Sequence, residues 1–168
     1  LGDVYKRQEQ YGGECFYFQA SLEQEGAGAE LLEKSVEALG GLDLLVNNAG
    51  VTRFENILDL TAEVFDLLFH LDFKNYILLM QAAARYMVKN KIRGSLVNIT
   101  SSRGERAYAG DFLYGGLKAG LNRAIQSIAL DLAPYGIRVN NVAPGAIRVR
   151  DKQELAAQGR TDFWDDLG

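Results

Sequence analysis

The chain has 168 residues, 48% of them hydrophobic and 24% charged, which is typical of one globular domain with a core of its own. Its net charge of −4 argues against a nucleic-acid partner, and no apolar run reaches the ~18 residues that a membrane helix needs. Cys15 is the only cysteine and His70 the only histidine, which excludes an internal disulfide and argues against a metal site of the zinc type. No secretory signal opens the chain, so we expect a cytoplasmic protein without a membrane partner.

The first predicted elements are a strand, a helix and a second strand. Residues 1–8 begin without a methionine; we interpret them as non-native adapter sequence and leave them out of the fold prediction. The apolar run at 15–20 predicts a buried strand. Helical spacing of apolar residues predicts a helix over 29–39, which Gly40 and Gly41 end. Residues 42–46 predict a short strand that leads into Asn47-Asn48-Ala49-Gly50.

The remaining elements continue the alternation of helices and strands. Thr61 is a suitable N-cap for a long apolar helix over 62–91, which we expect to be bent. A strand over 95–100, a polar loop over 101–111, a helix to about Leu132 and a strand over 137–142 follow, and the tail over 146–168 is charged and irregular. This alternation predicts an α/β fold with a doubly wound parallel sheet and helices on both faces, a three-layer α/β/α sandwich.

One pair on the last predicted helix has a specific chemical meaning. Tyr114 and Lys118 are four residues apart, so they lie on the same helix face. A phenol has an ordinary pKa of about 10, and a nearby positive charge lowers that pKa towards the working range of an acid or base catalyst. Such a pair also occurs by chance, and it gains weight only from other signals at the same place.

Three other motifs are predicted at the carboxyl edge of the sheet, where ligands bind in open parallel α/β folds. Asn47-Asn48-Ala49-Gly50 follows one strand, Ser101 follows the next, and Pro144-Gly145 follows the last. Each alone is ordinary turn chemistry. In this order, with Ser101 thirteen residues before Tyr114, they resemble the short-chain dehydrogenase/reductase family over residues ~14 to ~150.

The resemblance implies a Rossmann-like fold and a role for each motif. Tyr114 would be the acid/base, Lys118 would lower its pKa and bind the nicotinamide ribose, and Ser101 would hold the substrate oxygen. A hydride would pass between NAD or NADP and a carbonyl or secondary alcohol, a small molecule that is polar or sugar-like. The residues expected to bind the cofactor, besides Tyr114 and Lys118, are Asn48, Ala49, Gly50, Pro144, Gly145 and Ile147. No residue is expected to bind a metal.

The chain departs from the family pattern at three positions. The asparagine that completes the family's proton relay falls on Asp72, whose charge would oppose a phenolate at Tyr114; Asn75 is nearby, but the local pattern favours Asp72. Ser21 replaces an aspartate that contacts adenine, and Val149 replaces a threonine near the nicotinamide. These departures keep open an alternative, a non-catalytic scaffold or inactive fragment that binds a partner or nucleotide without turnover.

The resemblance also predicts that residues 1–168 are a single partial domain. The family's first strand–helix–strand unit, with its glycine-rich phosphate loop, and its last strand are not found in this sequence, and residues 146–168 correspond to the start of a substrate lid. We therefore expect this polypeptide to bind dinucleotide weakly or not at all. The long helix and the Tyr114 helix resemble the pair that forms the family's dimer interface, so the parent protein is expected to be a homodimer or homotetramer.

Overall fold

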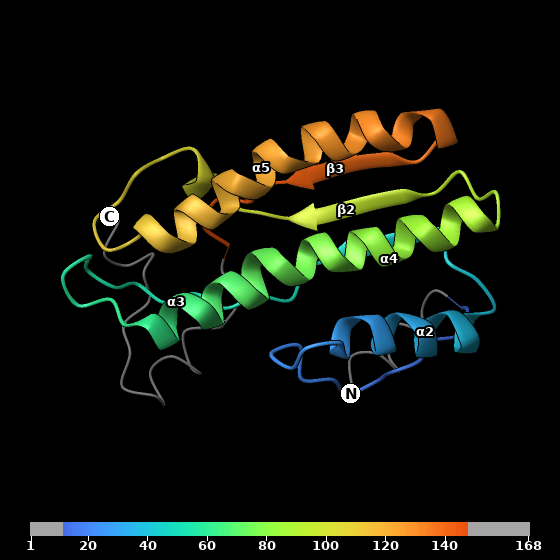
Figure 1. The fold of residues 1–168 in the computed structure, drawn as a ribbon, viewed down its shortest axis with the longest axis horizontal. Helices are drawn as coiled ribbons and strands as arrows, with labels where there is room; N and C mark the ends of the chain where they lie inside the picture. Colours follow the sequence, from blue (N-terminus) through green and yellow to red (C-terminus); the bar gives the residue numbers. More distant parts are fainter. Residues whose placement is uncertain (1–11, 148–168) are drawn as a thin grey trace.

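The computed structural model describes residues 12–147, which form a parallel sheet packed against helices (Figure 1). In chain order the strands are β1 (Leu44–Asn47), β2 (Ser95–Ile99) and β3 (Arg138–Val142). The sheet order is β1-β2-β3, and both pairings are parallel, with Asn47 opposite Asn98 and Asn98 opposite Asn141. The chain thus has the α/β architecture with an open parallel sheet that its alternating pattern predicts.

The helices follow the predicted segments closely. Helix α2 spans Ala27–Leu39, and α5 spans Phe112–Leu132. The long apolar segment forms α3 (Ala62–Phe69), a π-helix (His70–Lys74) and α4 (Asn75–Lys89) in one continuous run. The Thr61 side chain caps α3 by accepting a hydrogen bond from the Val64 N–H, as its position predicts. A π-helix interrupts this α-helical run, and its wider turn is frequently found at functional sites.

One element is predicted wrongly for the described residues. Residues 15–20 form no strand, because a strand exists only when its backbone pairs with a neighbour, and none of the three described strands pairs with them. In Figure 1, α4 and α5 lie on one face of the sheet and α2 lies beside α4. Leu44, Val46 and Val142 are exposed, so helices among the described residues do not enclose the sheet on both faces.

The core lies between the sheet and this layer of helices. The buried apolar cluster combines side chains of α2, α4, β2 and β3 with one residue before β1 and one before β3; its members are Leu32, Leu42, Met80, Ala83, Ala84, Met87, Leu96, Ile137 and Val139. No helix among residues 12–147 is long and apolar enough to span a bilayer. The core holds α4 and α5 on one face of the sheet, so that α3 and the first turns of α5 lie toward the strand ends, where the candidate site is found (Figure 1).

Candidate active site

Because the three strands are parallel neighbours, their carboxyl ends lie at one edge of the sheet, the edge to which the arrowheads of β2 and β3 point in Figure 1. The segment after β2 is tied to the segment after β3 by two backbone hydrogen bonds, from Thr100 N–H to the Val142 carbonyl (2.8 Å) and from Ser102 N–H to the Pro144 carbonyl (3.0 Å). The predicted Asn48–Gly50, Ser101 and Pro144–Gly145 motifs therefore follow neighbouring strands along the same edge. The edge has the polar composition that a ligand site requires.

Tyr114 and Ser101 come together at this edge, as the resemblance predicts. Tyr114 lies in the first turn of α5 and is half-buried. Its phenol forms hydrogen bonds with the side chains of Ser101 and Thr52. The Ser101 hydroxyl also accepts a hydrogen bond from the Arg103 N–H at 3.2 Å, which fixes its orientation. Two hydroxyls from two different loops thus converge on the phenol oxygen.

The direction of the Tyr114 pKa shift corrects the expectation from its spacing to Lys118. Burial raises the pKa of the phenol, hydrogen bonding with Ser101 and Thr52 opposes this shift, and the carboxylates of Asp72 and Asp111 raise the pKa further. The net direction is upward, whereas the Tyr114–Lys118 pair predicts a lowered pKa. The phenol therefore remains protonated at neutral pH.

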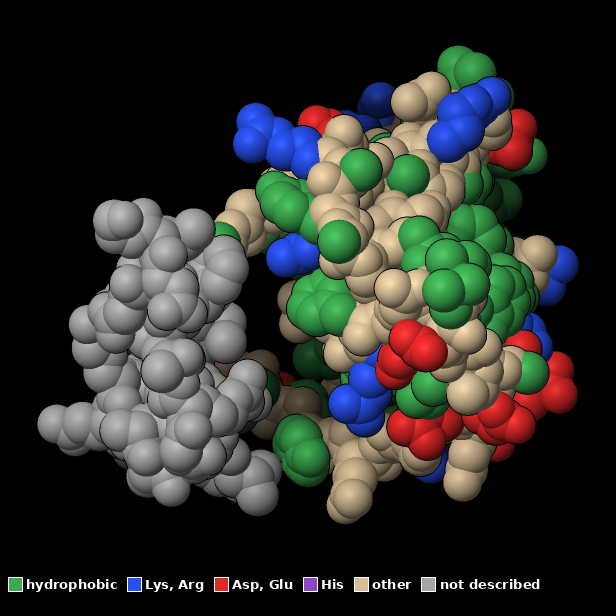
Figure 2. Space-filling view, turned by 90° about the vertical axis from the view of Figure 1, so that its left-hand side faces the viewer, with side chains coloured by type: hydrophobic (Ala, Val, Ile, Leu, Met, Phe, Trp, Pro, Cys, Tyr) green, Lys and Arg blue, Asp and Glu red, His purple; other side chains and the backbone are tan. Residues whose placement is uncertain are grey.

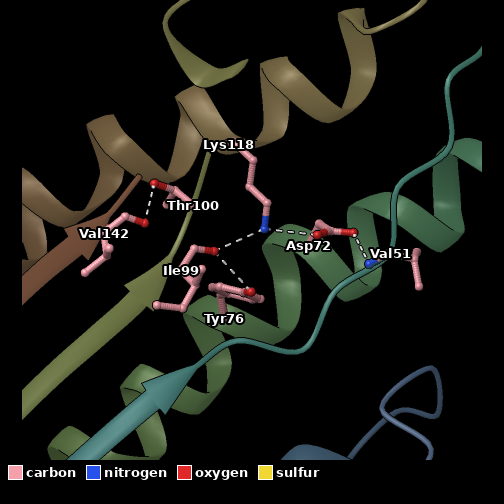
Figure 3. A network of polar contacts seen from close by, with 7 residues as sticks. All are labelled: Val51, Asp72, Tyr76, Ile99, Thr100, Lys118 and Val142. Atoms are coloured by element: carbon pink, nitrogen blue, oxygen red, sulfur yellow. Dashed lines mark hydrogen bonds and ion pairs between the residues drawn. The ribbon is translucent and has the colours of Figure 1, made fainter. Parts of the chain in front are cut away.

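Lys118 fails to lower that pKa because its charge is held by another group (Figure 3). Its ammonium lies 3.0 Å from Oδ1 of Asp72, with both side chains buried, and 3.5 Å from the Ile99 carbonyl. It also lies over the ring of Tyr76, 4.6 Å from the centroid, whereas the Tyr114 centroid is 5.5 Å away. The carboxylate neutralises the ammonium, and little net positive charge remains to stabilise a phenolate.

Asp72 reaches Lys118 because it lies on the π-helix between α3 and α4. Its other oxygen, Oδ2, accepts a hydrogen bond from Val51 N–H at 3.2 Å, and a Cβ on Gly50 would lie only 2.5 Å from Oδ1. The carboxylate thus packs tightly against the turn after β1. Asn75 is directed elsewhere, since its amide donates to the Leu22 carbonyl. The structure brings Asp72, and not Asn75, to Lys118 and Tyr114.

A row of buried and half-buried side-chain amides, which we call the amide ladder, supports the edge from inside the sheet. Asn47 on β1 donates to Asn98 on β2, Asn98 donates to Asn141 on β3, and Asn141 donates to Asn122 on α5, each at 2.9 Å. Because buried amides are costly when unpaired, this ladder fixes the register of the strands. It also fixes the helix that carries Tyr114 relative to the strand ends.

The residues predicted to bind a cofactor line the same edge. Asn48, Ala49 and Gly50 are exposed just beyond β1, whereas Pro144 is partly buried beyond β3. Among the described residues, a Cβ on Gly145 would meet no atom within 4 Å, and Ile147 is 64% exposed. The described residues therefore leave space beside this backbone. Residues 1–8 and Val149, together with the remainder of the predicted lid, lie outside the described residues.

The structure also places three residues at the site that sequence reasoning did not select. Thr52 contacts the Tyr114 phenol, the Tyr76 ring lies against Lys118, and the Arg103 backbone orients Ser101. Tyr76 follows Asp72 by four residues, a spacing that could have placed it on the same helix face. Thr52 and Arg103 lie in irregular loops, whose contacts follow no sequence period.

Comparisons with known proteins find similar sequences and similar folds. A sequence model described as short chain dehydrogenase matches residues 2–159. The L-xylulose reductase of Mesocricetus auratus is 34% identical over 136 residues, which are 81% of this chain and 53% of that protein. The L-rhamnose 1-dehydrogenase (NAD(P)(+)) of Azotobacter vinelandii is 35% identical over 147 residues, 87% of this chain and 57% of that protein. The chain therefore spans about half the length of these curated relatives.

A solved structure shares the fold as well as the sequence. A short chain dehydrogenase from Burkholderia cenocepacia, crystallised in complex with NADP, superposes with a TM-score of 0.78 at 35% sequence identity. The match covers 86% of this chain and 58% of that chain.

Proposed function

This chain belongs to the short-chain dehydrogenase family, and from that premise we propose that its whole protein is an NAD- or NADP-dependent oxidoreductase acting on a carbonyl/secondary-alcohol pair. The observation that carries the proposal is the convergence of Ser101 and Thr52 on the phenol of Tyr114, at the edge formed by the strand ends. A reacting oxygen at this point would be within reach of a proton donor and of a hydroxyl that holds it.

Tyr114 is proposed to donate a proton to the substrate oxygen in reduction and to accept one in oxidation. Its raised pKa keeps the donor form populated at neutral pH, which favours a role as general acid in reduction. Ser101 is proposed to hold the substrate oxygen, since its hydroxyl is oriented by the Arg103 N–H. Fixing one oxygen between two such groups removes much of the orientational part of the barrier.

The edge residues Asn48, Ala49, Gly50, Pro144, Gly145 and Ile147 are proposed to hold the dinucleotide. The space that the described residues leave beside Gly145 supports a flat group at that position. When bound, the nicotinamide would supply or receive the hydride. Lys118 would contribute its remaining N–H donors to the bound group, while Asp72 and the Ile99 carbonyl hold its ammonium in place.

We propose a small polar substrate, with sugars as the first compounds to test. Two relatives bear the names of sugar enzymes, an L-xylulose reductase and an L-rhamnose dehydrogenase. The whole protein should therefore be assayed with a panel of sugars and small hydroxyketones, with NADH and with NADPH, in both directions. This panel also resolves which cofactor is used.

The decisive variant is Tyr114→Phe in the whole protein. Losing the proton donor should lower kcat by about 10²–10⁴-fold and leave cofactor affinity nearly unchanged. Tyr135→Phe is the matched control, because Tyr135 is an exposed tyrosine beyond the far end of α5 and should turn over like the wild type. Equal turnover by both variants would contradict the proposal.

A second candidate is a family member that binds nucleotide or a partner without turnover. The observation that favours it is the Asp72–Lys118 pair, which removes the positive charge that would activate the phenol. It predicts no turnover by the wild type on the whole panel, together with measurable dinucleotide binding. The same assays therefore discriminate the two functions.

We further propose that the whole protein associates as a homodimer or homotetramer through α4 and α5. A groove of about 490 Å³ lies between these helices, lined by Ile77, Met80, Ala84, Ile128 and Leu132 among others. An apolar groove of this kind supports contact with a second copy of the same surface. The molar mass by light scattering tests this, and a monomer at micromolar concentration would contradict it.

A further inference from the structure

The Arg103 side chain joins the two loops that carry the site. Its guanidinium forms a salt bridge with Asp111, with Nη1 and Oδ2 3.0 Å apart. The same group lies over two aromatic rings, 4.7 Å from the Phe54 centroid and 4.5 Å from the Tyr108 centroid. Phe54 belongs to the loop after β1, whereas Tyr108 and Asp111 belong to the loop after β2. A stacked arginine with a carboxylate partner is a well-ordered junction.

The backbone holds the same two loops together around this junction. Glu55 N–H donates to the Gly110 carbonyl at 2.9 Å, which pairs one loop with the other. A Cβ on Gly115 would lie 2.8 Å from the Arg103 carbonyl oxygen, so the turn that contains Arg103 packs directly on α5. Figure 2 views this end of the molecule, where apolar and charged side chains intermingle.

Both loops carry groups that bond to the Tyr114 phenol. Thr52 lies two residues before Phe54, and Ser101 accepts its hydrogen bond from the Arg103 N–H itself. Asp111 directly precedes α5, and its carbonyl accepts from Gly115 N–H at 2.9 Å in the turn that includes Tyr114. Movement of the Arg103 side chain would therefore be transmitted to both hydroxyls and to the start of the catalytic helix.

Arg103 also balances a buried charge. Asp111 is 3% exposed, and its Oδ1 has no hydrogen-bond partner among the described residues, so Arg103 is the cation that compensates it. A buried carboxylate deprived of its partner is strongly unfavourable. The other charged or titratable groups packed around Tyr114 are Asp72 on the π-helix, Tyr76 on α4 and Lys118 on α5.

We propose that Arg103 is a positioning residue of this site, which locks the loop after β1 to the loop after β2 and neutralises Asp111 beside Tyr114. The inference rests on the proposed role of Tyr114 as acid/base. It assigns to one side chain a geometric task, which is to hold Ser101 and Thr52 against the phenol. It also assigns an electrostatic task, which is to keep the Asp111 charge from reaching the phenol uncompensated.

The electrostatic task is tested with Arg103→Met, Asp111→Asn and the double variant. Removing the cation should move the Tyr114 titration upward by roughly half a pH unit, and removing the carboxylate should move it downward by a similar amount. The double variant should return near the wild type. Two measurements report this titration. One is the alkaline limb of the pH profile of kcat/KM in reduction. The other does not need turnover: each variant is titrated with and without the additional substitution Tyr114→Phe, and the difference in tyrosinate absorbance belongs to Tyr114.

The geometric task is tested by comparing Arg103→Lys with Arg103→Met. Lysine restores the positive charge but not the planar, stacked fork. The lysine variant should therefore recover the wild-type titration while kcat stays about ten-fold or more below the wild type, with a smaller change in KM. Arg106→Met is the matched control, because Arg106 is an exposed arginine of the same loop; it should change neither the titration nor kcat.

Several results would overturn the inference. One is a titration that Arg103→Met and Asp111→Asn leave unmoved or move in the same direction. Another is full kcat in Arg103→Lys and Arg103→Met together. If Arg103→Met does not fold, Asp111→Asn and Arg103→Lys still decide the question. If the whole protein turns over no substrate, the proposed function fails, and the tyrosinate titration alone decides the electrostatic part of this inference.

Discussion

Replacing Asp72 by asparagine separates the charge of the buried pair from its shape. The carboxylate accepts from Val51 N–H through one oxygen and faces the Lys118 ammonium through the other. Asparagine has one carbonyl oxygen and no charge, so it can keep one of these contacts at most. The substitution leaves Lys118, whose side chain is 3% exposed, as a buried cation without its counterion.

The expected cost follows from that burial. Removing one partner of a buried ion pair lowers the free energy of unfolding by about 3–5 kcal/mol. Because asparagine has nearly the same shape as aspartate and is still polar, we expect Asp72→Asn to lie at the lower end of this range, about 3 kcal/mol. With a urea dependence of about 2 kcal/mol per molar, the unfolding midpoint should fall by roughly 1.5 M. Asp66→Asn is the control; Asp66 is exposed on α3, and its replacement should leave the midpoint within the scatter of the wild type.

The same substitution should lower the pKa of Tyr114. Asp72 raises that pKa through its negative charge, and without it the Lys118 charge is no longer neutralised. We expect a fall of about one unit, equivalent to about 1.4 kcal/mol, which would move the alkaline limb of the proposed reduction to lower pH. An unchanged or raised Tyr114 titration in a folded Asp72→Asn protein would refute the view that this pair withholds the lysine charge from the phenol.

Three further results are expected. Gly50→Ala should lower the free energy of unfolding, measured in urea, by about 1–3 kcal/mol, because its Cβ would lie 2.5 Å from Asp72. Gly116→Ala is the control and should be neutral or stabilising, because its Cβ would meet no atom of the described residues within 4 Å. Equal effects of the two substitutions would contradict this. Asn98→Leu should cost about 2–4 kcal/mol by unpairing both its neighbours in the amide ladder, and a neutral result would show that the ladder contributes nothing. Burial, and after it the Asp72 charge, raises the pKa of Tyr76 in the folded protein. The protonated phenol therefore contributes its full stabilisation below pH about 10, and this contribution is lost as the pH rises through the raised pKa. The free energy of unfolding of Tyr76→Phe should consequently fall less steeply above pH 10 than that of the wild type.

The regular elements could be predicted from the sequence because their determinants are local. Apolar periodicity predicts α2, α4 and α5, and Thr61 marks the start of α3 through a contact with Val64 three residues on. The strand expected at 15–20 fails because strand formation depends on a partner that local sequence does not specify.

Some residues of the candidate site could be predicted from the local sequence, and others could not. Ser101 and Tyr114 could be predicted from a fixed spacing, and the structure brings them together. The partner of Lys118 could not, since its pairing with Asp72 depends on how α5 packs on the π-helix. The sequence reasoning did foresee that an aspartate at position 72 would oppose ionisation of the phenol, because that argument needed only its charge.

The π-helix at His70–Lys74 makes the site sensitive to the length of the chain as well as to its composition. A π-turn is an α-helical run with one residue too many, and each residue corresponds to a rotation of about 100°. Deleting one residue there would let α3 and α4 merge into an uninterrupted α-helix with better internal hydrogen bonding. It would also rotate α3 about the axis of α4 and move position 72 away from the Lys118 ammonium. An uninterrupted α-helix and the Asp72–Lys118 ion pair are therefore incompatible in this chain, and the extra residue of the π-turn is what places the carboxylate beside its partner.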